Sequence, residues 1–165
     1  GLNKIKCENN VKSLLFEENR LIISRSANIF GPQVGGKNFT GIALNTLLNS
    51  NVIRLNSNKI VVKDFLPIDN HSQILCSLIN NNVSGIFNVG SGVKMTLGDL
   101  CNAFIAGYGS GNIVDEDIID DQFMLDISKI KKYICFEISK KSVLNYAYNV
   151  GYNLNPKKWN LKRYC

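Results

Sequence analysis

The chain has 165 residues, of which 45% are hydrophobic and 19% are charged. This length and composition fit one globular domain with a buried core and exclude an intrinsically disordered chain. The formal net charge is +6, but the lysines are scattered, and only residues 157–163 form a dense basic cluster. Dispersed positive charge is typical of a solvated surface, so nucleic-acid binding is the least favoured function.

The five cysteines are odd in number and far apart, and none belongs to a Cys-x-x-Cys pair: Cys7, Cys76, Cys101, Cys135 and Cys165. This pattern argues against a disulfide framework and a zinc site, and it predicts reduced thiols in a cytoplasmic protein without a bound metal. The sequence contains no membrane-spanning stretch and no signal peptide, so we expect no membrane partner. Because the chain begins at Gly1 without a methionine, we expect a fragment of a longer protein.

A helix followed by a strand is predicted at the start of the chain. Apolar residues recur at three- and four-residue steps over residues 1–18, and three branched aliphatic residues begin a strand over Leu21–Arg25. The polar residue Asn28 and the turn residues Gly31 and Pro32 follow this strand. Ligands of open α/β sheets bind beyond the carboxyl ends of strands, so the pattern indicates a ligand crevice here. A buried strand followed by an ordinary turn is the alternative.

The rest of the chain continues the alternation of helix and strand that is typical of an α/β fold. We expect His71 to lie on the surface, and the glycine-rich segments lack the Gly-x-Gly-x-x-Gly spacing of a dinucleotide loop. The predicted elements are a helix over 39–48, strands over 52–55 and 60–62, a helix to Leu78 capped by Asp69 or Asn70, a strand and glycine turn over 85–92, and helices beginning near Thr96, Asp126 and Val143.

Residues Gly1–Glu8 and Arg25–Pro32 together resemble the extended short-chain dehydrogenase/reductase family, which includes NAD-dependent nucleotide-sugar epimerases, dehydratases and reductases. That family carries Tyr-x-x-x-Lys on the helix before a strand that ends in Arg-x-x-Asn-x-x-Gly-Pro. Residues 62–70, 85–92 and 126–129 resemble later family segments, in the family's order. The match makes Lys4 the family's lysine and places its tyrosine immediately before Gly1, outside this chain.

The resemblance implies the carboxyl-terminal part of a Rossmann-like doubly wound parallel sheet with a small α/β substrate-binding portion. Residues 1–34 would end the NAD-binding domain, with the catalytic helix and the following strand. Residues 35–151 would form mainly the substrate-binding portion, with some returning Rossmann elements, and residues 152–165 a basic tail. The glycine-rich loop would lie outside the chain, so we expect the isolated fragment to be inactive. A homodimer of the full-length protein is a further expectation.

The resemblance implies a catalytic role for Lys4 and NAD or NADP as cofactor. Residues four apart lie on one helix face, so a lysine at this spacing lowers the pKa of the tyrosine and makes it an acid/base near neutrality. Lys4 would also donate to the nicotinamide ribose, beside the backbone of Ser26 and Ala27. Without the Asn28 motif, Lys4 would be interpreted as an ordinary surface lysine.

The resemblance also implies three substrate-binding residues. Asn28 would offer its amide to the substrate, Lys63 replaces an arginine that grips a substrate phosphate, and Phe65 would lie near the nucleotide. Lysine keeps the positive charge but cannot make the bidentate contact of an arginine. Phe65 is equally well explained as a core residue. Where many relatives have a second phosphate-binding arginine, this chain has Glu116 between two aspartates, which is the wrong sign for a phosphate.

The leading prediction is therefore part of a nucleotide-sugar epimerase or dehydratase that serves cell-surface polysaccharide precursor synthesis. The alternative is a non-catalytic nucleotide-binding sensor or scaffold of the same fold. A tyrosine encoded immediately before Gly1 would favour the enzyme, and any other residue the alternative. A small basic nucleic-acid-binding protein ranks last, because no aromatic platform accompanies the basic tail.

Overall fold

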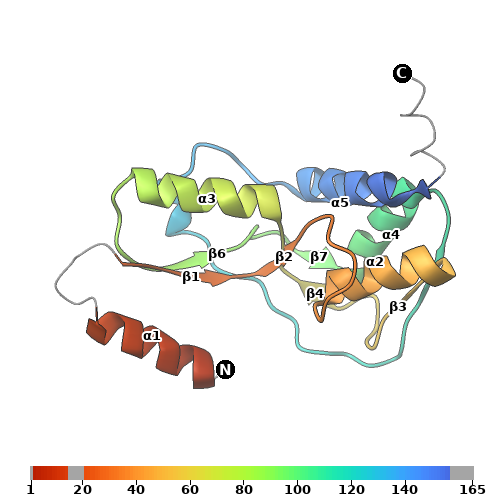
Figure 1. Ribbon diagram of the computed structural model, residues 1–165, viewed down its shortest axis with the longest axis horizontal. Helices are drawn as coiled ribbons and strands as arrows, with labels where there is room; N and C mark the ends of the chain where they lie inside the picture. Colours follow the sequence, from red (N-terminus) through yellow and green to blue (C-terminus); the bar gives the residue numbers. More distant parts are fainter. Residues whose placement is uncertain (1, 15–20, 157–165) are drawn as a thin grey trace.

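The computed structural model describes residues 2–14 and 21–156, in which helices alternate with short strands (Figure 1). The helices are α1 (Leu2–Leu14), α2 (Phe39–Ser50), α3 (Ile68–Asn80), α4 (Leu97–Tyr108) and α5 (Lys140–Leu154), with a 3-10 helix at Ile130–Lys132. The strands are β1 (Ile22–Ser26), β2 (Asn28–Phe30), β3 (Val52–Arg54), β4 (Val62–Lys63), β5 (Phe65–Pro67), β6 (Gly85–Val89), β7 (Met95–Thr96) and β8 (Asn112–Val114). The predicted α/β class is confirmed.

The strands of the described residues associate in pairs, most of which are parallel. β1 pairs with β6 in parallel, from Ile22 opposite Gly85 to Ser26 opposite Val89. β2 pairs with β5 and β3 with β8, also in parallel, whereas β4 and β7 are antiparallel. Parallel neighbours require crossover connections, which α2, α3 and α4 supply.

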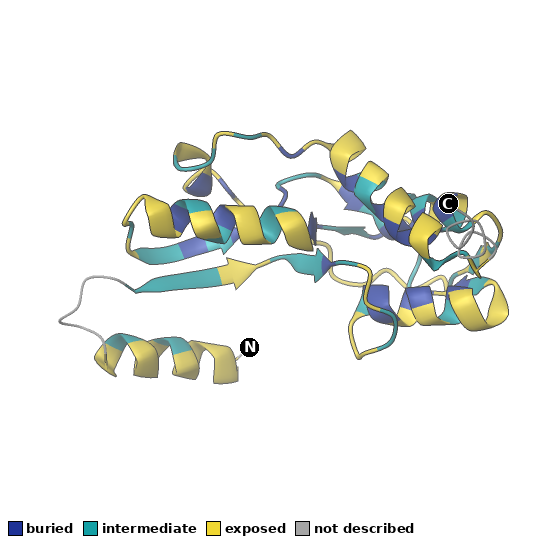
Figure 2. Ribbon diagram, turned by 45° about the horizontal axis from the view of Figure 1, so that its top comes forward, coloured by how far each residue is buried: buried dark blue, intermediate teal, exposed yellow. Residues whose placement is uncertain are grey.

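Helices lie on both sides of the β1–β6 pair (Figure 1). α3 covers one side and buries Ile74 and Leu78. α1 lies on the other side and buries none of its own residues, as its mainly exposed colouring in Figure 2 shows. The apolar side chains of Leu2 and Leu14 are 74% and 81% exposed. α1 therefore has little packing of its own to stabilise it, which matters for a helix of this length.

Aromatic side chains join the central strands to the helices. The ring of Phe30 meets those of Phe65 and Phe104 edge-on, at centroid distances of 6.4 and 6.0 Å. α4 and α5 cross where Gly107 and Gly151 face each other's helix, and a Cβ on either glycine would strike the backbone of the opposite helix. Glycine is needed at both positions because two helix backbones approach closely there.

Several predicted boundaries move in the structure. α3 begins at Ile68, with Pro67 at the N-cap position, so the predicted capping role of Asp69 or Asn70 is wrong. The fixed φ of proline is already suited to a helix start, and Asp69 instead lies in the first turn, where a carboxylate favours the helix dipole. α4 begins next to Thr96 as predicted, and Thr96 caps it in a reciprocal arrangement with Asp99.

The helix predicted from Asp126 is also wrong. The Asp126 carboxylate accepts a hydrogen bond from the Ser128 amide at 2.9 Å and so forms a turn, and only the short 3-10 helix follows. An aspartate that bonds to the backbone two residues later competes with helix formation. The strand predicted over 60–62 begins only at Val62.

Some predicted features lie outside the described residues, namely the end of the first helix over 15–18 and the basic tail over 157–165. None of the helices in the described part of the chain combines the length and the apolar character that crossing a lipid bilayer requires.

Candidate active site

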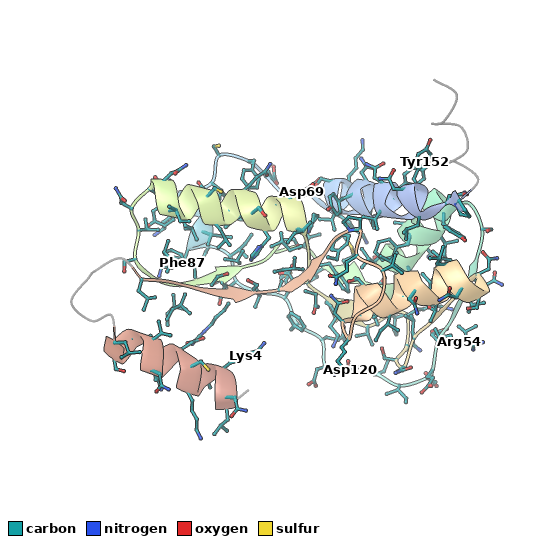
Figure 3. The ribbon with its side chains drawn as sticks, viewed as in Figure 1. Lys4, Arg54, Asp69, Phe87, Asp120 and Tyr152 are labelled. Atoms are coloured by element: carbon teal, nitrogen blue, oxygen red, sulfur yellow. The ribbon has the colours of Figure 1, made fainter. Side chains whose placement is uncertain are left out.

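A groove of about 1000 Å³ separates α1 from β1. Lys4 contributes to it from α1, and Ser26 and Ala27 contribute from the end of β1. Figure 3 labels Lys4 on its helix. The remaining lining is largely apolar and includes Ile5, Val11, Leu21, Ile22 and Ile23. The structure therefore brings Lys4, Ser26 and Ala27, predicted from far-separated motifs, to one groove.

The groove is closed at one point by an ion pair between Glu8 and Arg25. The Arg25 guanidinium donates from Nε to Oε1 of Glu8 at 2.9 Å and from Nη2 to Oε2 at 2.7 Å. The hydrogen bond from Arg25 lowers the pKa of Glu8, and the same contact raises the pKa of Arg25. A two-point contact of this kind fixes orientation as well as distance. It sets how α1 presents Lys4 to the strand.

Ser26 and Ala27 lie where the chain passes from β1 to β2. The Ala27 amide donates to the Val89 carbonyl at 2.8 Å, which continues the β1–β6 pairing. The Ser26 hydroxyl lies 2.9 Å from the hydroxyl of Ser24 and 3.1 Å from Nε2 of His71, near the start of α3. His71 is therefore partly buried rather than free on the surface, and desolvation lowers its pKa.

Asn28 begins β2 and is not among the residues that line the groove. The backbone amide of Asn28 donates to the backbone carbonyl of Asp64 at 3.1 Å. This bond joins β2 to the residue between β4 and β5. Asn28 therefore follows the groove residues directly in the chain, and its partly buried backbone belongs to the central pairing. The predicted substrate contact of its side chain remains a prediction.

Lys63 makes an ion pair with Asp120. Its ammonium donates to Oδ2 of Asp120 at 2.8 Å, and the Lys63 side chain is only 15% exposed. The Phe123 ring centroid lies 5.7 Å from the same nitrogen. The cation that the resemblance assigns to a substrate phosphate is therefore held by a carboxylate of the chain itself.

Phe65 is 1% exposed and packs in the core against Phe30 and Phe39. This is the position of a core phenylalanine, the alternative that the sequence left open. Neither Lys63 nor Phe65 is among the described residues that line the groove beside Lys4.

Asp64, to which the sequence assigned no role, is a fully buried carboxylate beside Lys63. Its Oδ1 accepts from the amide and hydroxyl of Ser91, at 2.9 and 2.6 Å, and its Oδ2 from the amides of Gly92 and Leu125, at 3.2 and 3.3 Å. A Cβ on Gly90 would lie 2.5 Å from Oδ2, so only glycine allows this approach. An aspartate within the apolar run 61–66 was the available signal, since a buried charge must be compensated by hydrogen bonds.

Among the described residues, no group of three or more histidine, cysteine, aspartate or glutamate side chains is placed to bind a metal ion. The arrangement instead offers a lysine beside a strand end. Chemically, such a site can orient a ligand and stabilise a neighbouring negative charge.

No family model matches the chain, and no curated protein matches it. Solved structures similar to the chain include an NAD-dependent NDP-hexosamine 5,6-dehydratase, a UDP-N-acetylglucosamine 4-epimerase and a dTDP-glucose 4,6-dehydratase. The chain therefore has the Rossmann-like fold of these enzymes, and the resemblance predicted from the sequence is confirmed at the level of the fold. Neighbours among the solved structures are complexed with NAD or NADPH.

Three solved structures illustrate the likeness. The UDP-N-acetylglucosamine 4-epimerase from Methanobrevibacter ruminantium M1, in complex with UDP-N-acetylmuramic acid, is 20% identical, with 97% of this chain and 52% of that chain covered and a TM-score of 0.73. The UDP-glucuronic acid 4-epimerase from Bacillus cereus, in complex with UDP-glucuronic acid and NAD, is 16% identical, with 93% and 52% covered and a TM-score of 0.72. The dTDP-glucose 4,6-dehydratase from Bacillus anthracis str. Ames, in complex with NAD, is 17% identical, with 84% and 46% covered and a TM-score of 0.65. The chain thus spans about half the length of the structures it matches.

Proposed function

We propose that this chain is the carboxyl-terminal portion of an NAD(P)-dependent epimerase or dehydratase that acts on a nucleotide sugar. In this proposal residues 1–34 end the cofactor-binding domain, residues 35–151 form mainly the substrate-binding portion, and residues 152–165 a basic tail. The enzyme would serve the synthesis of cell-surface polysaccharide precursors in the cytoplasm. A homodimer of the full-length protein belongs to the same proposal.

The observation that carries the proposal is the shared groove of Lys4, Ser26 and Ala27. Lys4 is exposed, and among the described residues it makes no ion pair. Its ammonium is therefore available to a ligand. The apolar wall formed by Ile22 and Ile23 suits the face of a flat ring, and the backbone of Ala27 ends that wall. The apolar wall would therefore suit the nicotinamide ring, and Lys4 the hydroxyl groups of its ribose.

Each residue has a limited task in the proposed reaction. When bound, NAD(P) would supply the hydride chemistry at a carbon of the sugar. Lys4 would lower the pKa of a tyrosine contributed from outside this chain and donate to the ribose hydroxyls. Ser26 and Ala27 would position the cofactor, and Asn28 and Lys63 would orient the substrate. In this proposal the tyrosine and the glycine-rich loop would come from outside this chain, and the isolated chain would turn over no substrate.

The alternative is a non-catalytic protein of the same fold that binds a nucleotide as a sensor or scaffold. The ion pair between Lys63 and Asp120 favours this alternative, because it leaves the proposed phosphate contact occupied. The two functions differ in one observable property, since only the enzyme converts a sugar.

The experiment is an assay of the full-length protein with NAD or NADP and a panel of UDP- and dTDP-sugars, with products separated by chromatography. We expect conversion of at least one sugar, and Lys4→Met should lower the rate by about 100-fold or more, the size of a general acid–base contribution. Lys6→Met is the matched control, since Lys6 is an exposed lysine on the same helix that does not line the groove.

Conversion that is equally fast in the Lys4→Met and Lys6→Met proteins would overturn the catalytic role. Nucleotide binding without any conversion would favour the sensor or scaffold. Turnover by the 165-residue chain alone would contradict the proposed division of the active site.

A further inference from the structure

A segment rich in carboxylates lies along the strand that carries Lys63. This acidic segment, residues 115–125, contains five acidic residues and no basic residue. Its backbone is bonded to the region before and within β4: the Asn58 amide donates to the Ile118 carbonyl at 2.7 Å, and the Phe123 amide donates to the Val62 carbonyl at 3.2 Å. The segment is thereby held against the residues that flank Lys63.

The acidic segment surrounds the Lys63 ammonium on two sides. Asp120 accepts its hydrogen bond at 2.8 Å, and Phe123 presents its ring at 5.7 Å. The Gln122 side chain accepts a hydrogen bond at 3.3 Å from the backbone amide of Val62, the residue before Lys63 in β4. Lys63 is 15% exposed, whereas the Asp120 side chain is 56% exposed. The carboxylate is thus the more exposed partner of the pair.

An anionic ligand that binds the Lys63 ammonium at this position competes with the Asp120 carboxylate, which already accepts its hydrogen bond. A ligand that must first displace an internal group binds with an affinity reduced by the fraction of molecules in which the site is open. A phosphate would also meet the weaker negative field of the more distant carboxylates in the acidic segment, which salt attenuates. A ligand that is uncharged at this point meets neither obstacle.

We propose that Asp120 is an affinity-determining residue, whose carboxylate competes with a substrate phosphate for Lys63 and so lowers the affinity of this subsite for the diphosphate group. The inference rests on the proposed function in one respect, namely that Lys63 faces the substrate. The inference adds that the Asp120 carboxylate, by competing with the diphosphate group for Lys63, determines how tightly the diphosphate binds. Neither Lys63 nor Asp120, which Figure 3 labels, is among the described residues that line the groove beside α1, so the competition does not involve that groove.

The test measures binding of inorganic pyrophosphate and of UDP to the full chain by titration calorimetry at low ionic strength. Asp120→Asn removes the charge but keeps an oxygen that can accept from the Asp121 amide, as Oδ1 of Asp120 does at 2.8 Å. The matched control is Asp115→Asn in the same segment, because Asp115 pairs with Lys59, at 3.7 Å, and not with Lys63. The remaining variants are Lys63→Met alone and Lys63→Met combined with Asp120→Asn.

We expect Asp120→Asn to tighten pyrophosphate and UDP binding by about tenfold, as for a competitor that occupies the site in about nine molecules of ten. Asp115→Asn should tighten binding by less than about twofold, because only a distant, screened charge is removed. The combined variant should lose the gain. The inference is overturned if Asp120→Asn binds no more tightly than Asp115→Asn, or if it binds no pyrophosphate at millimolar concentration.

The outcomes separate this inference from the proposed function. If Lys63→Met weakens UDP binding but Asp120→Asn behaves like Asp115→Asn, the competition is refuted and the proposed substrate contact of Lys63 stands. If Lys63→Met changes nothing in either background, both the competition and the substrate contact are refuted. Neither measurement depends on a cofactor or on turnover.

Discussion

Glu8 and Arg25 form a two-point ion pair that joins α1 to β1 across the groove, with contacts of 2.9 and 2.7 Å. The pair is a direct polar link between the two elements, and α1 buries no residue of its own. The placement of Lys4 opposite the end of β1 therefore depends on this contact.

We predict that Glu8→Gln loosens α1 without unfolding the rest of the protein. Amide hydrogen exchange in residues 2–14 should accelerate by about threefold to fivefold, as for an exposed ion pair, while exchange in α4 stays unchanged. Low pH should act in the same way. Because the pKa of Glu8 is lowered below its ordinary 4.5 in the folded state, the contact is complete above that value and is lost as the pH falls through the lower folded-state pKa. Lys6→Gln is the control, and equal acceleration by both variants would refute the role of the pair.

Asp64 should be among the most sensitive positions for stability. Replacement by asparagine turns one acceptor into a donor and leaves buried amides of Ser91, Gly92 or Leu125 without a partner. We expect Asp64→Asn to lower the free energy of unfolding by about 3 kcal/mol, measured by urea denaturation. The exposed Asp69→Asn should cost less than about 1 kcal/mol, through the helix dipole alone. Similar losses in the two variants would contradict this account of Asp64.

Gly151 should resist a substitution that usually favours helices. Alanine stabilises an exposed helix interior by about 1 kcal/mol relative to glycine. At this position, however, the added Cβ would strike the Phe104 backbone in α4, so we expect Gly151→Ala to destabilise the fold by at least about 2 kcal/mol. The exposed Asn149→Ala on the same helix should be neutral or slightly stabilising. Thermal unfolding of both variants measures the difference, and a stabilising Gly151→Ala would show that α4 and α5 are not in contact there.

His71 should make the fold less stable in mild acid. Desolvation lowers its folded-state pKa below the ordinary 6.5, so the unfolded chain binds the proton more readily. The free energy of unfolding therefore falls as the pH drops below about 6.5. His71→Gln should show a smaller fall between pH 7.5 and 5.5, in about the range where histidine titrates. Denaturant titrations at several pH values test this, and identical pH profiles would be inconsistent with a partly buried neutral imidazole beside Ser26.

The thiols should differ sharply in reactivity. Burial raises the pKa of Cys101 to about 12, whereas Cys7, Cys76 and Cys135 are exposed. The thiolate is the reactive form, so we expect iodoacetamide to label the three exposed cysteines in the native protein and Cys101 only after unfolding. Peptide mass spectrometry resolves each site. Rapid native labelling of Cys101 would mean that the core around α4 opens readily.

The sequence by itself determined the α/β class, most of the helices and strands, and the likeness to nucleotide-sugar epimerases and dehydratases. These features follow from local patterns, because hydrophobic periodicity and short motifs are complete within a few turns or strands. The wrong predictions concern helix starts, where a single residue decides the local backbone conformation. Pro67 takes the N-cap position of α3, and the Asp126 side chain forms a turn in place of a helix.

The tertiary structure alone decided which distant residues each charged side chain contacts. Glu8 and Arg25 are 17 residues apart, Lys63 and Asp120 are 57 apart, and Asp64 reaches Leu125 across 61 residues. No local pattern encodes such pairs, since the crossovers between parallel strands determine which distant segments become neighbours. The sequence therefore predicts that Lys63 binds a substrate phosphate, whereas in the folded chain Lys63 pairs with Asp120.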